Sequence, residues 1–284
     1  MDRANHRAAP CPPGAAPFWV DQMEAGLAFV ERVLAHPVED DGEPLADIRE
    51  AARRAGVELR CAERPHAAER PRLFLLRARI VEPLLAAAAE LRAIDHTLVV
   101  EDAFRTREMQ RDLALANEVL EGLVAAVRRA EPDADPDAVI RRLSVVVATR
   151  PRGAGHMAGA AVDVTVHGPD GEPLDRGGPY LGISERMPMS SPFISDEAAL
   201  NRRLVSDVML RHGFVAFPFE FWHYSRDDAF ARVALDDPRP ARYGPLDVHT
   251  DGRTIPAADP DASLHARNEL AGRIRRLLRG EKRP

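Results

Sequence analysis

The first residues that could do chemistry lie in a glycine-rich turn and in the apolar strand that follows it. His156 lies in the turn, and Asp163 lies inside the run 161–166, whose valines and threonine are typical of a strand. Because side chains alternate along a strand, Ala161, Asp163 and Thr165 share one face. A carboxylate among apolar side chains is costly unless something pairs with it. A metal ion would provide that pairing, and His156 is a ready second ligand.

A second segment supplies a third candidate ligand and a candidate base. Six consecutive residues hold an acid, a histidine and four aromatic side chains, although only 5% of the chain is aromatic. These residues are Phe219, Glu220, Phe221, Trp222, His223 and Tyr224. His156, Asp163 and His223 would give three protein ligands and leave one position open, which is the arrangement of a catalytic zinc site. Glu220 would then be the general base for the metal-bound water.

Each of these signals also has an ordinary structural explanation when it is taken alone. A histidine beside a glycine turn is more often structural than a ligand, and Asp163 could cap a turn or pair with an arginine. The Glu-x-x-His spacing of Glu220 and His223 is weak evidence by itself. The combination is more specific than its parts, because both segments fit one known pattern.

These two segments, with a third one upstream, resemble the D-alanyl-D-alanine dipeptidase family of zinc peptidases. The family pattern Ser-x-His-x-x-Gly-x-Ala-x-Asp corresponds to residues 154–163, and the pattern Glu-x-Trp-His corresponds to residues 220–223. An upstream Asp-x-Tyr-Arg-Pro segment corresponds to residues 102–106. The order and spacing of the three segments agree. The resemblance covers about residues 72–245 and leaves most of both ends of the chain outside it.

The resemblance implies one zinc ion per chain, bound by the two histidines and the aspartate, and hydrolysis of an amide bond in a small peptide or a similar substrate. Glu220 would take the proton of the zinc-bound water and pass it to the leaving amine. Arg105 would stabilise the developing oxyanion, or it would only form a surface salt bridge to Asp102 or its neighbour. Asp102 would orient its neighbours. Trp222 and Tyr224 would either line the substrate pocket or belong to the core.

Three positions depart from the family pattern. Ala154 replaces a serine near the substrate, and Thr106 replaces the proline after the arginine. Leu181 occupies the place of an aspartate that binds the free amino group of the dipeptide, although Asp175 or Glu185 could reach the same place by another path. A buried ammonium without an anionic partner is strongly disfavoured. The hydrolytic residues are therefore expected to be complete, whereas those that recognise a free dipeptide are not.

Three other functions remain open. A carboxypeptidase or amidase of cell-wall or specialised metabolism would use the same residues on a different substrate. A non-haem Fe(II) oxygenase also uses two histidines and one carboxylate, but its acid typically follows the first histidine by about two residues. Here Asp163 follows His156 by seven, and Glu220 would have no role. A metal-binding protein without catalysis is the third alternative.

Composition limits the classes of partner. The 284 residues are 45% hydrophobic and 30% charged, as in ordinary soluble globular proteins, and the net charge of -6 argues against nucleic acid as the main partner. Cys11 and Cys61 lie far from the proposed site and do not form a disulfide framework. Residues 1–17 lack the apolar core of a signal peptide, and no run of ~18 apolar residues predicts a membrane span. We therefore expect a cytoplasmic protein, whose oligomeric state stays open.

The sequence predicts the α+β class, with a small, mostly antiparallel sheet, helices packed on one side of it and the zinc site at the sheet. The expected regions are a disordered N-terminus (1–17), a helical extension (18–71), a catalytic domain (72–245) and a C-terminal extension with a final helix (246–284). Helices are expected over 20–36, 47–56, 84–91, 107–129, 196–212 and 264–278. Strands are expected over 96–101, 143–148 and 214–219.

Overall fold

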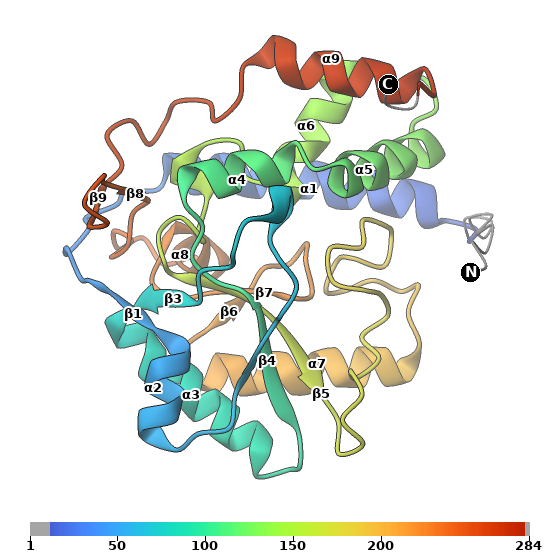
Figure 1. Ribbon diagram of the computed structural model, residues 1–284. Coiled ribbons are helices and arrows are strands. Elements are labelled where there is room, and N and C mark those ends of the chain that lie inside the picture. Colours follow the sequence, from blue (N-terminus) through green and yellow to red (C-terminus); the bar gives the residue numbers. More distant parts are fainter. Residues whose placement is uncertain (1–11, 282–284) are drawn as a thin grey trace.

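The computed structural model describes residues 12–281 (Figure 1). Most of the N-terminal segment that was expected to be disordered, together with Cys11, lies outside this range. The last three residues of that segment, 15–17, already belong to helix α1 (Ala15–Ala35), so the helix begins earlier than expected. Within the described residues, no helix is both long enough and apolar enough to cross a membrane.

A five-stranded sheet forms the centre of the molecule, in the order β2-β4-β5-β7-β6. The strands are β2 (Arg60–Cys61), β4 (Thr97–Asp102), β5 (Ala161–His167), β6 (Val215–Ala216) and β7 (His223–Ser225). Strand β2 runs parallel to β4, and the other pairs are antiparallel. The predicted α+β class with a mostly antiparallel sheet is therefore confirmed. The long apolar strands β4 and β5 form the middle of the sheet because β-branched side chains pack well on a pleated surface.

Helices pack directly on one face of this sheet, as predicted. They are α2 (Ile48–Ala55), α3 (Ala78–Arg92) and α7 (Asp196–Arg211), and in Figure 1 α3 and α7 lie below the strands. Their apolar side chains share one buried cluster with Leu98, Val100 and the valines of β5. The alternate residues of β5, including Asp163, therefore face the other way.

A second group of helices lies beyond the opposite face of the sheet (Figure 1). It contains α1, α4 (Arg107–Ala114), α5 (Asn117–Ala130), α6 (Pro136–Val146), α8 (Ala229–Ala234) and α9 (Arg267–Leu278). All of these helices contribute to one apolar cluster with the aromatic residues of the turn between β6 and β7, and α4 does so through Leu113 and Ala114. This helical layer thus covers the face of the sheet that carries Asp163.

Three predicted elements were wrong in type or length. Residues 143–148, expected as a strand, are mostly the end of α6, which Asp135 caps by accepting a hydrogen bond from the backbone N–H of Ala138. The expected helix 107–129 is broken after Leu115 into α4 and α5. The expected strand 214–219 is reduced to β6, because the chain turns at once to place the next segment. A short apolar run does not distinguish a buried helix from a strand.

Most other helix boundaries follow from their capping residues. Asp47 accepts hydrogen bonds at the start of α2, and Gly56 ends that helix with a φ of 64°. Thr106 caps α4 and Ser195 caps α7, each through its hydroxyl group. Each of these side chains satisfies a backbone N–H of the first turn, and glycine accepts the left-handed conformation that ends a helix. Pro83 lies inside α3, so the predicted helix 84–91 begins too late.

The remaining elements connect these layers. Strand β1 (Leu45–Asp47) pairs with β3 (Leu75–Arg77), and β8 (Leu246–Val248) pairs with β9 (Thr254–Pro256). Between β2 and β3 the chain crosses in front of β4 and forms the short helix η1 (Ala67–Glu69) beside α4 (Figure 1). A second short helix, η2 (Pro151–Gly153), leads into the glycine-rich turn.

The long connection between β5 and α7 is held by two buried arginines. Arg202 of α7 donates hydrogen bonds to the carbonyl oxygens of Arg176, Arg186 and Pro188 at 2.8, 2.6 and 2.6 Å. Arg176 donates to the carbonyl oxygens of Val164 and Phe221. Both guanidinium groups lie over the ring of Phe221. The two ends of this connection are therefore fixed to the sheet and to α7, while residues 177–185 extend between them.

Candidate metal centre

Strand pairing brings the predicted ligand residues together. Strands β5 and β7 pair so that Asp163 lies opposite His223, and His156 comes from the turn just before β5. The Nδ1 atom of His223 lies 3.0 Å from Oδ1 of Asp163 and 3.1 Å from Nε2 of His156. The Nε2 atom of His156 lies 3.2 Å from the same Oδ1 atom. All three residues are buried and form the candidate metal cluster of the described chain.

The triangle of donor atoms fits a metal ion of the size of zinc. Zinc ligands lie about 2.0–2.2 Å from the ion, so tetrahedral ligand atoms lie roughly 3.3–3.5 Å from one another. The three separations of 3.0–3.2 Å need to widen by only a few tenths of an ångström. Two imidazoles and one carboxylate, with space on one side of the triangle, also match the donor set of a catalytic zinc site.

Each ligand residue has its other polar atom held by a neighbour. Nδ1 of His156 donates to the carbonyl oxygen of Ala103 at 2.6 Å, which leaves the lone pair of Nε2 directed at the triangle. Nε2 of His223 lies 3.3 Å from Oγ of Ser225. Oδ2 of Asp163 accepts hydrogen bonds from Arg105 and from the hydroxyl of Tyr180, so Oδ1 remains for the metal. Such neighbours fix the tautomer and the orientation of metal ligands.

The electrostatic environment keeps the ligand residues in their metal-binding forms. Burial lowers the pKa of His223, which favours the neutral imidazole that binds metals. Burial alone would raise the pKa of Asp163, but the two facing histidines outweigh this effect and hold it well below its usual range. The carboxylate is therefore ionised at neutral pH.

Glu220 lies in the turn between β6 and β7 and lines the same small cavity as the three ligand residues. The cavity has a volume of about 50 Å³, which is enough for a few water molecules. Glu220 is 7% exposed, and burial first, then the charge of Asp163, raises the pKa of its carboxyl group well above the usual value. A carboxyl group with a raised pKa is suited to accept and return a proton near neutral pH.

A β-bulge places Arg105 between two buried carboxylates. The register of β4 and β5 shifts after Val100, so that Asp102 rather than the preceding glutamate lies opposite Asp163. Nε of Arg105 donates to Oδ2 of Asp102 at 2.8 Å, and its Nη2 donates to Oδ2 of Asp163 at 3.1 Å. Its Nη1 lies 3.3 Å from Oε1 of Gln110. Arg105 does pair with Asp102, but the pair is buried at the site and is not a surface salt bridge.

The structure separates the predicted substrate-contacting residues into two groups. Ala154, Leu181 and Trp222 line the cavity. Tyr224 does not, so its assignment to the pocket is wrong: it follows His223 along β7, and alternation directs it to the opposite face, where its hydroxyl lies 3.2 Å from Oγ of Ser206. Asp175 and Glu185, the alternatives to Leu181 for holding an amino group, are not among the residues that line the cavity.

The sequence did not indicate several residues around the ligands. Tyr180 donates a hydrogen bond to Oδ2 of Asp163 at 2.8 Å, and its ring packs edge-on against Trp222. Gln110 contacts Arg105, Ser225 contacts His223, and His66 lies 3.4 Å from Oδ2 of Asp102. These contacts join segments that are distant along the chain. The only available signal was Tyr180, a polar aromatic residue in a glycine-rich loop.

Replacing Tyr180 with phenylalanine removes one of the two hydrogen bonds to Oδ2 of Asp163 while retaining the ring. We expect zinc to bind about 10- to 100-fold more weakly, because residues that support a ligand typically have effects of this size. The measurement is a zinc dissociation constant from competition with a chelator. Tyr224→Phe is the matched control, since its hydroxyl lies on the other face of the sheet, and its zinc affinity should stay within about twofold. Equal affinities in both variants would contradict the expectation.

Comparison with known proteins identifies the family. A sequence profile described as D-ala-D-ala dipeptidase matches residues 61–241, which is more than half of the chain. The chain is a member of the D-ala-D-ala dipeptidase family. The D-alanyl-D-alanine dipeptidase of Escherichia coli (strain K12) is 32% identical over 85 residues, which cover 30% of this chain and 44% of that protein. The D-alanyl-D-alanine dipeptidase of Enterococcus faecium is 34% identical over 89 residues, 31% of this chain and 40% of that protein.

This D-ala-D-ala dipeptidase family member thus spans less than half of the length of the curated relatives that it matches. A solved structure of the D,D-pentapeptidase of a VanB-type vancomycin resistance cassette, in complex with Zn(II), covers 70% of this chain and 92% of its own, with 17% identity and a TM-score of 0.34. The family is one of zinc metallopeptidases, and His156, Asp163 and His223 are the residues of this member that can hold the ion.

Proposed function

We propose that the protein is a zinc-dependent hydrolase that cleaves an amide bond in a dipeptide or a similar small substrate. The observation that carries this proposal is a single buried cavity lined by the three candidate ligand residues, by Glu220 and by Arg105. A site that only stores metal needs neither a buried carboxyl group with a raised pKa nor a buried arginine beside the ligands. We also propose that residues 72–245 contain this catalytic unit and that it acts in the cytoplasm.

Glu220 and Arg105 have separate roles in the proposed hydrolysis. Zinc, when bound, would act as a Lewis acid and lower the pKa of a coordinated water to about 7. Glu220 takes a proton at its carboxylate, holds it in the buried cavity and returns it to the leaving nitrogen. Arg105 keeps further N–H groups beyond the three that are bonded to Asp102, Gln110 and Asp163, and these are available to the developing oxyanion.

We propose a substrate whose amino end carries no charge. Among the described residues that line the cavity, the acids are Asp163 and Glu220, and the mechanism uses both. Leu181 contributes an apolar side chain where an anion would be needed to hold an ammonium group. A site without a partner for a polar group cannot select for that group. This favours a carboxypeptidase or amidase that acts on a blocked substrate over a peptidase for the free dipeptide.

We expect kcat/KM for N-acetyl-D-alanyl-D-alanine to exceed that for free D-alanyl-D-alanine by at least about tenfold, or ~1.4 kcal/mol. Leu181→Asp should shift this ratio towards the free dipeptide by a similar factor, because it restores an anion at the same place. Leu181→Asn is the matched control, since asparagine is polar and has the size of aspartate but carries no charge. If the free dipeptide is the best substrate of the wild type by tenfold, the proposed specificity is wrong. Iron in place of zinc in the active protein would favour an oxygenase instead.

A further inference from the structure

A second cavity lies directly beside the catalytic one. Its volume is about 710 Å³, which is in the range of ligand-binding pockets, whereas the catalytic cavity of about 50 Å³ is too small for a peptide. Leu113 of α4 and Leu181 line both cavities and form the partition between them. A movement of these two side chains would therefore join the two spaces.

The partition has a strained backbone on one side. Leu181 adopts a φ of 62°, in the left-handed region that a bulky residue rarely occupies. It lies within residues 177–185, between the ends that Arg202 and Arg176 fix to the rest of the fold. Strained residues of this kind concentrate at ligand clamps and switches. The strained Leu181 can therefore change conformation while the two ends of its loop stay fixed to the sheet and to α7.

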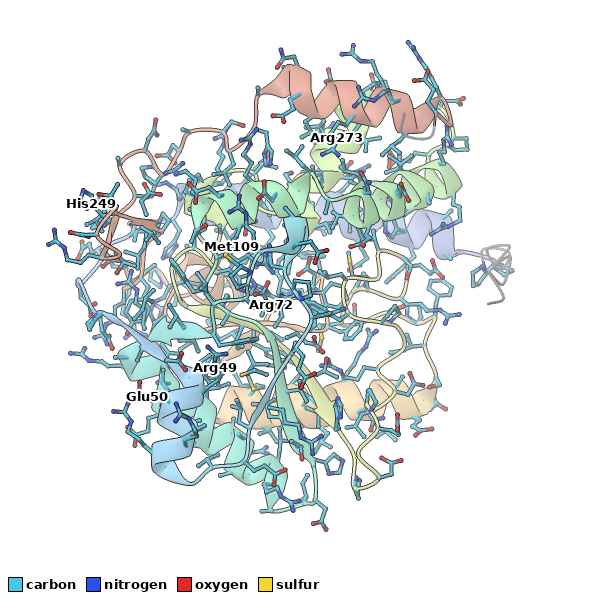
Figure 2. All side chains as sticks on the ribbon, in the orientation of Figure 1. Arg49, Glu50, Arg72, Met109, His249 and Arg273 are labelled. Atoms are coloured by element: carbon cyan, nitrogen blue, oxygen red, sulfur yellow. The ribbon has the colours of Figure 1, made fainter. Side chains whose placement is uncertain are left out.

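The second cavity has a buried polar wall that is connected to the catalytic site. His66 is 4% exposed, and neither of its ring nitrogens has a well-aligned hydrogen-bond partner among the described residues. Nη1 of Arg72 lies 3.0 Å from Oδ2 of Asp102, the same atom that accepts from Arg105. Figure 2 shows Arg72 in the middle of the molecule. Arg273 of α9 lines another side of the cavity and donates to the carbonyl oxygen of Leu115 at 2.6 Å.

The chemistry of this wall suits an amide chain better than a free amine. Asp102 is the buried acid of the wall, and it already faces Arg72, Arg105 and His66, so it has no capacity left for an ammonium group. A histidine with one free ring nitrogen can donate to a carbonyl or accept from an N–H, which are the two groups of a peptide bond. Asp112, which is half-buried, is paired with Arg70 at 2.6 Å, and the glutamates Glu69 and Glu118 are exposed at the rim.

We infer that the second cavity is a subsite for the amide chain that continues beyond the cleaved dipeptide unit, with the chain passing between Leu113 and Leu181. This inference rests on the proposed function and extends it. The substrate class is an acylated peptide of at least three residues. His66 binds the extra peptide bond, and α9 contributes to the subsite through Arg273 although it lies outside the segment matched by the family profile.

The test compares N-acetylglycyl-D-alanyl-D-alanine with N-acetyl-D-alanyl-D-alanine on the zinc-loaded protein. We expect kcat/KM of the wild type to be at least tenfold higher for the longer peptide. Ala116→Trp places a large side chain in the second cavity and should reduce this ratio to below threefold. Ala125→Trp is the matched control, because Ala125 lies on the exposed side of α5, the helix that Ala116 precedes as its N-cap residue, and the ratio should be unchanged. A wild-type ratio near one, or a ratio that survives in Ala116→Trp, would overturn the inference.

A binding measurement separates failure of the subsite from failure of the proposed function. The same two peptides are titrated by calorimetry into the zinc-loaded wild type and Ala116→Trp. If neither peptide is hydrolysed but the longer one binds at least tenfold more tightly, and Ala116→Trp abolishes the difference, the subsite is supported and the hydrolase is not. Equal dissociation constants, or no binding of either peptide, would show that the second cavity is not a peptide subsite.

Discussion

Replacing Glu220 with glutamine is expected to leave zinc bound and to lower kcat by at least about 10²-fold, the lower range for the loss of a general base. Glutamine keeps the size and polarity of the side chain, but it cannot accept a proton. The structure places this carboxyl group in the catalytic cavity without any of the contacts that join the three ligand residues. The measurements are steady-state kinetics on an acylated D,D-dipeptide and zinc content by elemental analysis.

Glu197→Gln serves as the control for Glu220→Gln, because Glu197 is an exposed acid on the first turn of α7, and both kcat and zinc content should be unchanged. A Glu220→Gln protein that keeps wild-type activity would remove this residue from the mechanism. A Glu220→Gln protein that loses its zinc would make the residue a ligand instead of a base.

The second large effect is expected from His223→Ala, which should abolish both zinc binding and activity. Removing this imidazole leaves His156 and Asp163 as the remaining donors of the triangle, too few for a catalytic zinc site. It also leaves Asp163 without one of the two histidines that lower the pKa of its buried carboxylate. Zinc content is measured by elemental analysis after dialysis, and folding is checked by circular dichroism.

His167→Ala is the control for the metal site. His167 ends strand β5 of the same sheet, and its Nδ1 contacts the carbonyl oxygen of Gly171 at 2.8 Å, away from the triangle. This variant should keep one zinc ion per chain. If His223→Ala retains stoichiometric zinc, the assignment of the third ligand is wrong.

The sequence was most informative where one short segment carries the chemistry. His156 and Asp163 lie seven residues apart in a turn and a strand, and His223 lies in a cluster of aromatic residues that is unusual for this chain. Residue type and spacing were enough to select them, and the fold brings them within hydrogen-bonding distance of one another. Helix α2 and the start of α7 could be predicted for a similar reason, since capping depends on residues within one turn.

Features that depend on packing between distant segments could not be predicted. The bulge that brings Asp102 opposite Asp163 is set by the pairing of β4 with β5, and no residue type in either strand predicts it. Tyr180 reaches Asp163 only because its loop folds over the site. Residues 143–148 are rich in β-branched side chains, as a strand would be. Most of them form the end of α6, which packs with α1 and α9 in one apolar cluster.

The way Arg202 holds the loop has a consequence for how substrate preference can change. Within the loop its guanidinium group donates only to main-chain oxygens, at residues 176, 186, 188 and 189, and a main-chain oxygen is present whichever side chain occupies the position. The side chains of residues 181–185 can therefore be exchanged without removing the fixed points at either end. Tyr180 within this loop donates a hydrogen bond to Asp163, so a change of selectivity that leaves the metal centre intact must keep Tyr180 as well as Arg176 and Arg202.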